Sequence, residues 1–230
     1  MEDFNPDNIS LLTCRSRIDL WIQFINLTGA SDIGEIGVFR GIFASQILKN
    51  CVLINKYYMI DPWRKLEDWN KPLNIDNQTF EQCYLESLER TAFAKNKRIV
   101  LRGKTTEVIN HIEDKSLDLI YIDGDHTLKG ISIDLLNSYS KVRDGGWIAG
   151  DDFCSSIWQH KSNFEPTLIF PYAIYFAEAI GARIYALPFN QFLIKKDIKN
   201  KDFRFLNLSG DPRYNNISLL KQIEIKLKNE

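Results

Sequence analysis

Two stretches of the chain decide its fold: residues 117–126, LDLIYIDGDH, and residues 145–153, GGWIAGDDF. Each contains a short apolar run that predicts a buried strand, residues 117–122 in the first and residues 147–149 in the second. One helix-length segment separates the two runs, so the unit predicts a strand, a helix and a parallel neighbouring strand. Carboxylates follow both runs directly, and ligands bind outside the carboxyl ends of strands in such sheets.

These carboxylates indicate a cation site. The strand order predicts that Asp123, Asp125, Asp151 and Asp152 meet in one small volume, where they repel one another unless a cation or protons hold them. A hard divalent cation with oxygen ligands is the natural occupant of such a cluster. Helix capping is the alternative for Asp125, but capping does not explain the second pair of aspartates.

Helices and strands are predicted to alternate along the rest of the chain, which favours an α/β fold. Helical periodicity is expected at residues 16–26, 42–50, 78–94 and 172–180. Further strands are expected at residues 32–36, 57–60, 99–101, 182–187 and 191–194. Two segments without clear periodicity, residues 64–77 and 153–171, are expected to be irregular.

The predicted elements form one domain over residues 1–196, in which residues 1–31 are an N-terminal helical extension. Residues 197–230 are expected to be a polar C-terminal tail, with an amphipathic helix at residues 217–227. The chain shows no internal repeat and no low-complexity linker.

Size and composition limit the class of protein. The 230 residues fit a single α/β domain, and 44% hydrophobic residues suffice for a full core. The net charge of −1 gives no global basic field, so neither nucleic acid nor an anionic membrane is expected as a partner. The polar, acidic start of the chain and the four scattered cysteines predict a cytoplasmic protein with reduced thiols.

The turn after the first predicted strand, residues 35–41, has the sequence EIGVFRG. A dinucleotide-binding fingerprint has its second glycine two positions after the first. Phe39 occupies that position here, which argues against NAD or FAD. The acid-x-Gly-x-x-x-Gly form of Glu35, Gly37 and Gly41 instead resembles the first motif of class I S-adenosyl-L-methionine-dependent methyltransferases, although a purely structural glycine turn is an alternative.

The resemblance covers about residues 32–195 and extends to the metal-dependent O-methyltransferases. Within these the chain is most similar to the small group of macrolide-sugar and aminocoumarin-sugar O-methyltransferases, with catechol O-methyltransferase a more distant relative. The Asp-Gly-Asp-His and Gly-Asp-Asp motifs carry the resemblance, since Asp151 and Asp152 follow Asp123 by 28 and 29 positions. It implies a Rossmann-like, doubly wound, mostly parallel seven-stranded sheet with an antiparallel C-terminal hairpin strand and helices on both faces.

The resemblance also implies which residues bind ligands. Asp123, Asp151 and Asp152 would hold Mg²⁺ or Mn²⁺. Thr105 and Thr106 stand where the family often has a serine near the adenine. The residues expected to contact the cofactor are Glu35, Gly37, Phe39, Gly41, Asp61, Gly103, Thr105 and Asp123.

The implied activity is methyl transfer to a hydroxyl of a small molecule with neighbouring oxygens, such as a sugar diol or a catechol. A bound metal lowers the pKa of that hydroxyl and orients it, and Asp125 is the expected general base. His126 is the alternative base, or it hydrogen-bonds cofactor or backbone instead.

Two other functions remain open: the same fold acting on RNA or protein, and a cofactor-binding member that transfers no methyl group. Small members of such families often self-associate through N-terminal helices, so a homo-oligomer is compatible with the sequence. Neither irregular segment identifies the acceptor.

Overall fold

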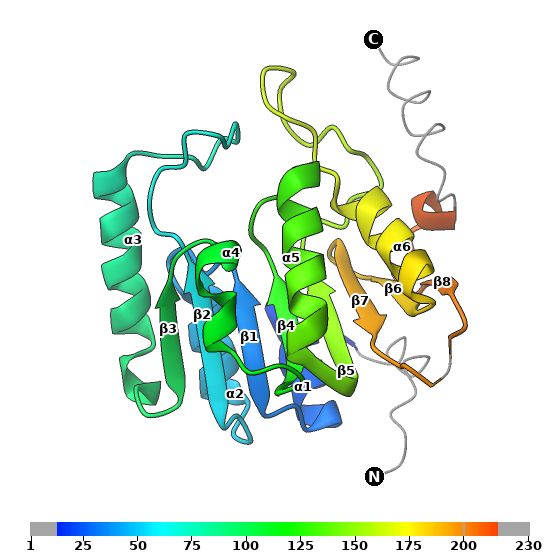
Figure 1. Ribbon diagram of the computed structural model, residues 1–230, viewed down its shortest axis with the longest axis horizontal. Coiled ribbons are helices and arrows are strands. Elements are labelled where there is room, and N and C mark those ends of the chain that lie inside the picture. Colours follow the sequence, from blue (N-terminus) through cyan, green and yellow to red (C-terminus); the bar gives the residue numbers. More distant parts are fainter. Residues whose placement is uncertain (1–12, 200, 216–230) are drawn as a thin grey trace.

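The computed structural model describes residues 13–199 and 201–215, and Figure 1 shows one sheet with helices on both faces. The strands are β1 (Asp32–Ile36), β2 (Lys56–Asp61), β3 (Arg98–Arg102), β4 (Leu117–Ile122), β5 (Val142–Gly150), β6 (Arg183–Leu187), β7 (Gln191–Lys195) and β8 (Arg204–Asn207). The α-helices are α1 (Arg17–Thr28), α2 (Ile42–Asn50), α3 (Asn77–Arg90), α4 (Thr105–Val108), α5 (Leu128–Lys141) and α6 (Ile169–Ile180). Short 3₁₀ turns are η2 (Ala92–Ala94), η3 (Ile109–His111) and η4 (Pro212–Asn215).

The strand order is β3-β2-β1-β4-β5-β7-β6-β8, and β7 is the strand that runs antiparallel to its neighbours. This confirms the predicted doubly wound, mostly parallel sheet with an antiparallel strand from the C-terminal hairpin. The chain order reverses at β1, which pairs with β2 on one side and β4 on the other. The carboxyl ends of β1, β2, β4 and β5 therefore meet at one edge, where such folds bind ligands.

Alternating side chains of the central strands fill two cores, one on each face of the sheet. In β4, Leu119 and Tyr121 pack under α1 and α2, whereas Ile120 and Ile122 pack under α5 and α6. Because strand side chains point alternately to opposite faces, a continuous apolar run is what a strand covered on both sides requires. This is why residues 117–122, apolar except for Asp118, predict the strand correctly.

Over residues 13–199 and 201–215 the sheet has eight strands rather than the expected seven. The added strand, β8, lies in the segment expected to be a polar tail and pairs in parallel with β6. Its two apolar residues anchor it on opposite faces, because Phe205 packs against the core under α6 and Leu206 against the other core. The amphipathic helix expected at residues 217–227 lies outside the described residues.

Helix α6 begins at Ile169, three residues before the expected start. Pro171 is compatible with this earlier start, because it stands in the first turn of the helix, where backbone N–H groups need no intrahelical partner. Within the described part of the chain, no helix has the length and apolar character needed to span a bilayer.

We predict that Tyr214→Ala lowers the free energy of unfolding by about 3 kcal/mol, the usual cost of removing a buried aromatic ring. The Tyr214 side chain is 2% exposed, and its ring stacks on Phe153 with centroids 5.8 Å apart. Urea denaturation would measure the change, with Tyr175→Ala as a control, since Tyr175 is 49% exposed. Equal, small losses in both variants would contradict the packing of residues 201–215 on the sheet.

Candidate functional site

A cleft of about 670 Å³ opens at the carboxyl edge of the sheet. The turns that follow β1 to β4 form its floor, and the loops that precede α3 and α6 extend above it (Figure 1). Every residue that the sequence predicted for cofactor, metal or catalysis lines this cleft, apart from Gly41 and Asp151. The sheet topology thus brings together residues from five different turns.

The turn after β1 can form only because Gly37 has no side chain. Gly37 has φ +89°, and a Cβ at this position would lie 2.0 Å from the carbonyl oxygen of Asp123. Gly41 also has a positive φ of +70°, and its Cβ would meet the backbone of Ser87 in α3. Gly37 therefore brings the backbone next to the β4 turn, and Gly41 lets α2 start close to α3.

Asp61, at the end of β2, holds the glycine turn in place. Its Oδ2 accepts hydrogen bonds from the backbone N–H groups of Val38 (3.0 Å) and Phe39 (2.8 Å), and its Oδ1 accepts one from Trp63 (2.7 Å). Burial raises the pKa of Asp61, and the three backbone hydrogen bonds oppose that shift. The sequence predicted that this carboxylate contacts the cofactor; in this structure it lines the cleft and hydrogen-bonds the glycine turn.

Glu35 lies below the turn and is 1% exposed. The Tyr57 hydroxyl donates a hydrogen bond of 2.6 Å to Glu35 Oε2. Burial raises the pKa of Glu35 to about 8 and outweighs the effect of that hydrogen bond. The carboxyl group is therefore largely protonated at neutral pH.

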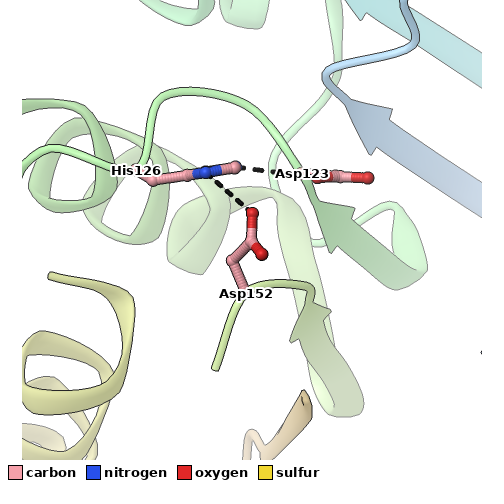
Figure 2. A group of neighbouring side chains, drawn as sticks. All are labelled: Asp123, His126 and Asp152. Carbon is pink, nitrogen blue, oxygen red and sulfur yellow. Dashed lines mark ion pairs between the residues drawn. The ribbon is translucent and has the colours of Figure 1, made fainter. Parts of the chain in front are cut away.

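Two basic side chains contact the aspartate cluster. Nη1 of Arg17, in the first turn of α1, lies 3.0 Å from Asp123 Oδ2 and also pairs with Asp151. Asp152 contacts His126 instead: the distance from His126 Nδ1 to Asp152 Oδ2 is 2.7 Å (Figure 2). The other ring nitrogen of His126, Nε2, lies 3.6 Å from Asp123 Oδ1. Each of the three predicted metal ligands thus contacts a basic side chain, Arg17 or His126.

His126 is a cation in this arrangement. Burial lowers the pKa of His126, but the contacts with Asp123 and Asp152 outweigh burial and raise it to about 9. The same three residues offer ligand atoms that all lie within 4.8 Å of one another. A divalent ion is therefore geometrically compatible with Asp123, Asp152 and the neutral form of His126.

Asp125 lies on the wall of the cleft against the start of α5. Its Oδ1 accepts hydrogen bonds from the backbone N–H of Thr127 (2.9 Å) and from Nε1 of Trp69 (2.9 Å). Thr127, not Asp125, caps α5 through its hydroxyl and the N–H of Gly130. Asp125 thus anchors the loop before α3 to the floor of the cleft.

Thr105 and Asp134 form a buried pair in the same cleft. The Thr105 hydroxyl donates to Asp134 Oδ1 at 2.6 Å, and burial raises the pKa of Asp134 to about 7. Sequence reasoning missed Asp134, although one signal was present. It stands on the apolar stripe of α5 between Ile131 and Ser138, where a carboxylate needs a specific partner.

A lysine joins the two loops above the cleft. Nζ of Lys71 donates hydrogen bonds to the carbonyl oxygens of Glu165 (2.8 Å) and Pro166 (3.1 Å). Lys71 is buried and lines the cleft, as does His160 from the second loop. The loop before α3 and the loop before α6 are thus fastened to each other.

The sequence pattern of the methyltransferase domain family matches residues 35–153, more than half of the chain. This region contains the glycine turn, Asp61 and the aspartate cluster up to Asp152. No curated protein matches the chain in sequence.

Several solved structures share the fold at low sequence identity. A protein assigned as a caffeoyl-CoA O-methyltransferase from Staphylococcus aureus has a TM-score of 0.59 and 17% identity, over 81% of this chain and 85% of that one. The Podospora anserina methyltransferase PaMTH1, with S-adenosylhomocysteine (SAH) bound, has a TM-score of 0.56 and 14% identity, over 84% and 83%. The O-methyltransferase TomG from Streptomyces achromogenes, in complex with S-adenosylmethionine (SAM), has a TM-score of 0.54 and 13% identity, over 81% and 82%.

We predict that Glu35→Gln flattens the pH dependence of stability. Between about pH 4.5, where an ordinary glutamate titrates, and about pH 8, the folded chain holds a proton on Glu35 that the unfolded chain has lost. The free energy of unfolding of the wild type therefore falls as the pH rises through this interval. The variant should lose this contribution, a few kcal/mol at most since one pKa unit is about 1.4 kcal/mol.

Urea denaturation at several pH values would measure the effect. The exposed Glu89→Gln variant is a suitable control and should follow the wild type. Parallel curves for wild type and Glu35→Gln would mean that Glu35 is charged in the folded chain.

Proposed function

The chain belongs to the methyltransferase domain family, and on that premise we propose that it transfers a methyl group from SAM to a hydroxyl group of a small molecule. The observation that carries this proposal is the contact between the Gly37 turn and Asp123. It sets the expected cofactor turn directly beside the aspartate cluster, in one cleft. Methyl donor and acceptor oxygen would then meet there without further movement of the sheet.

The cofactor residues are assigned by their places along the cleft. The Gly37 turn would face the aminoacyl part of SAM, Asp61 the ribose, and Gly103 with Thr105 the adenine. Oδ1 of Asp61 accepts a single hydrogen bond, from the Trp63 N–H, and retains acceptor capacity because a carboxylate oxygen has two lone pairs. SAM bound to TomG and SAH bound to PaMTH1, which share this fold, support SAM as the cofactor.

We further propose that Asp123, Asp151 and Asp152 hold Mg²⁺ or Mn²⁺. These residues fit a hard cation, since carboxylate oxygens are its preferred donors and Asp123 and Asp151 already enclose the positive charge of Arg17. When bound, the metal would lower the pKa of the acceptor hydroxyl and orient it.

Asp125 is the proposed acceptor of the hydroxyl proton. It lines the cleft, and among the described residues both of its hydrogen bonds go to Oδ1. His126 is paired with Asp152 and protonated, so in this arrangement it has no lone pair for a second proton. Its proposed role is to orient Asp152 and Asp123.

The partner is proposed to be a small molecule with neighbouring oxygens, a sugar diol or a catechol. The two fastened loops would cover the acceptor, which suits a small ligand better than a nucleic acid or a membrane surface. A cytoplasmic location, a homo-oligomeric state and the division into residues 1–196 and a tail stay predictions.

Calorimetric titration with SAM and SAH tests the cofactor site. Wild type should bind both, and Asp61→Asn should bind SAH about tenfold more weakly, or about 1.4 kcal/mol, because the amide cannot accept all three backbone hydrogen bonds. Asp144→Asn, at the opposite edge of the sheet and exposed, is the matched control. Absence of binding by the wild type would overturn the proposed function.

A screen of catechols and sugar diols, read out as SAH release, tests the transfer itself. Activity should require Mg²⁺ or Mn²⁺, and Asp151→Asn should lower it about 100-fold or more, since the metal supplies several kcal/mol. Full activity in a chelator would remove the metal from the proposal but leave methyl transfer intact. Cofactor binding without transfer to any acceptor would favour a binding protein.

A further inference from the structure

The positive charge inside the aspartate cluster comes from the chain itself. Arg17 is the first residue of α1, whose start is capped by Ser16. Its guanidinium lies between Asp123 and Asp151, which follow the paired strands β4 and β5. It also lies 5.8 Å from the ring centroid of Phe43, so two carboxylates and an aromatic face surround it.

This contact is built into the packing of α1. Gln191 of β7 donates a hydrogen bond from Nε2 to Asp151 Oδ1. Its Oε1 accepts hydrogen bonds of 2.8 Å from Trp21 Nε1 and from the Tyr121 hydroxyl. Trp21 stands four residues after Arg17, so both side chains project from the same face of α1. One buried amide therefore fixes the helix that carries Arg17 and the carboxylate that Arg17 binds.

A metal ion and the guanidinium compete for the same oxygens. An ion bound to both Asp123 and Asp151 must lie within about 2.5 Å of each carboxylate, which is the space that Nη1 of Arg17 occupies. The metal ion and the Arg17 guanidinium, both positively charged, would repel each other strongly at such a short distance in a half-buried site. The apparent metal affinity is then the intrinsic affinity of the carboxylates multiplied by the fraction of molecules in which Arg17 is not docked on them.

We infer that Arg17 is the resident counter-ion of Asp123 and Asp151, and that a divalent cation binds these carboxylates only by displacing its guanidinium. Arg17 thereby sets the metal affinity of the site and couples metal loading to the first turn of α1. The inference rests on the metal site of the proposed function.

Titration of the metal-free protein with Mn²⁺, followed by calorimetry, tests the inference. Arg17→Met keeps the aliphatic stem but removes the charge, and it should bind Mn²⁺ at least about tenfold more tightly than wild type. Arg17→Gln is a second variant should the first fold poorly. Arg15→Ala, which removes a neighbouring exposed charge, should leave the affinity unchanged.

The outcomes separate this inference from the proposed function. An unchanged or weaker Mn²⁺ affinity in Arg17→Met and Arg17→Gln, with SAH binding intact, would overturn the role of Arg17 and leave the metal site standing. No Mn²⁺ binding by any variant, with SAH bound normally, would overturn the metal site and this inference together.

Thermal denaturation in chelator gives a readout that is independent of activity. The Arg17 variants should melt below wild type there, and Mn²⁺ should restore more of their stability than it adds to wild type.

Discussion

The site depends on one close approach of two backbone segments. The N–H of Asp123 donates to the carbonyl of Ile36, and Gly37 then passes so near the Asp123 carbonyl that no side chain fits between them. The N–H of Gly37 in turn donates to Ile60 at the end of β2. Three neighbouring strands are thus tied together at their carboxyl ends, and the expected cofactor turn and the aspartates become parts of one surface.

The same edge concentrates buried carboxyl groups, and each is stabilised by a different part of the chain. Backbone N–H groups hold Asp61, a threonine hydroxyl holds Asp134, and a tyrosine hydroxyl holds Glu35. Asp151 forms an ion pair with the Arg17 guanidinium and accepts a hydrogen bond from the Gln191 side-chain amide. Because a buried polar or charged group without a partner is costly, these partners restrain the turns that carry the carboxyl groups.

Much of this arrangement could be predicted from the sequence. The apolar runs before Asp123 and Asp151 are long enough to identify strands, and their spacing leaves room for a single crossover helix. Arg17 could not be predicted, because it meets Asp123 across 106 positions and no local periodicity encodes such a pair. Strand β8 was missed for a related reason. Its four residues lie in a charged segment, and only contacts with β6 and both cores make them a strand.

Lys71 joins the loop before α3 to the loop before α6. Because its ammonium group donates hydrogen bonds to carbonyl oxygens of the opposite loop, the two loops form one structural unit. An insertion or deletion in one would pull on the other through a buried side chain. Exchanging these loops for those of a relative would therefore require both to be transplanted together, with the lysine and its carbonyl partners in register.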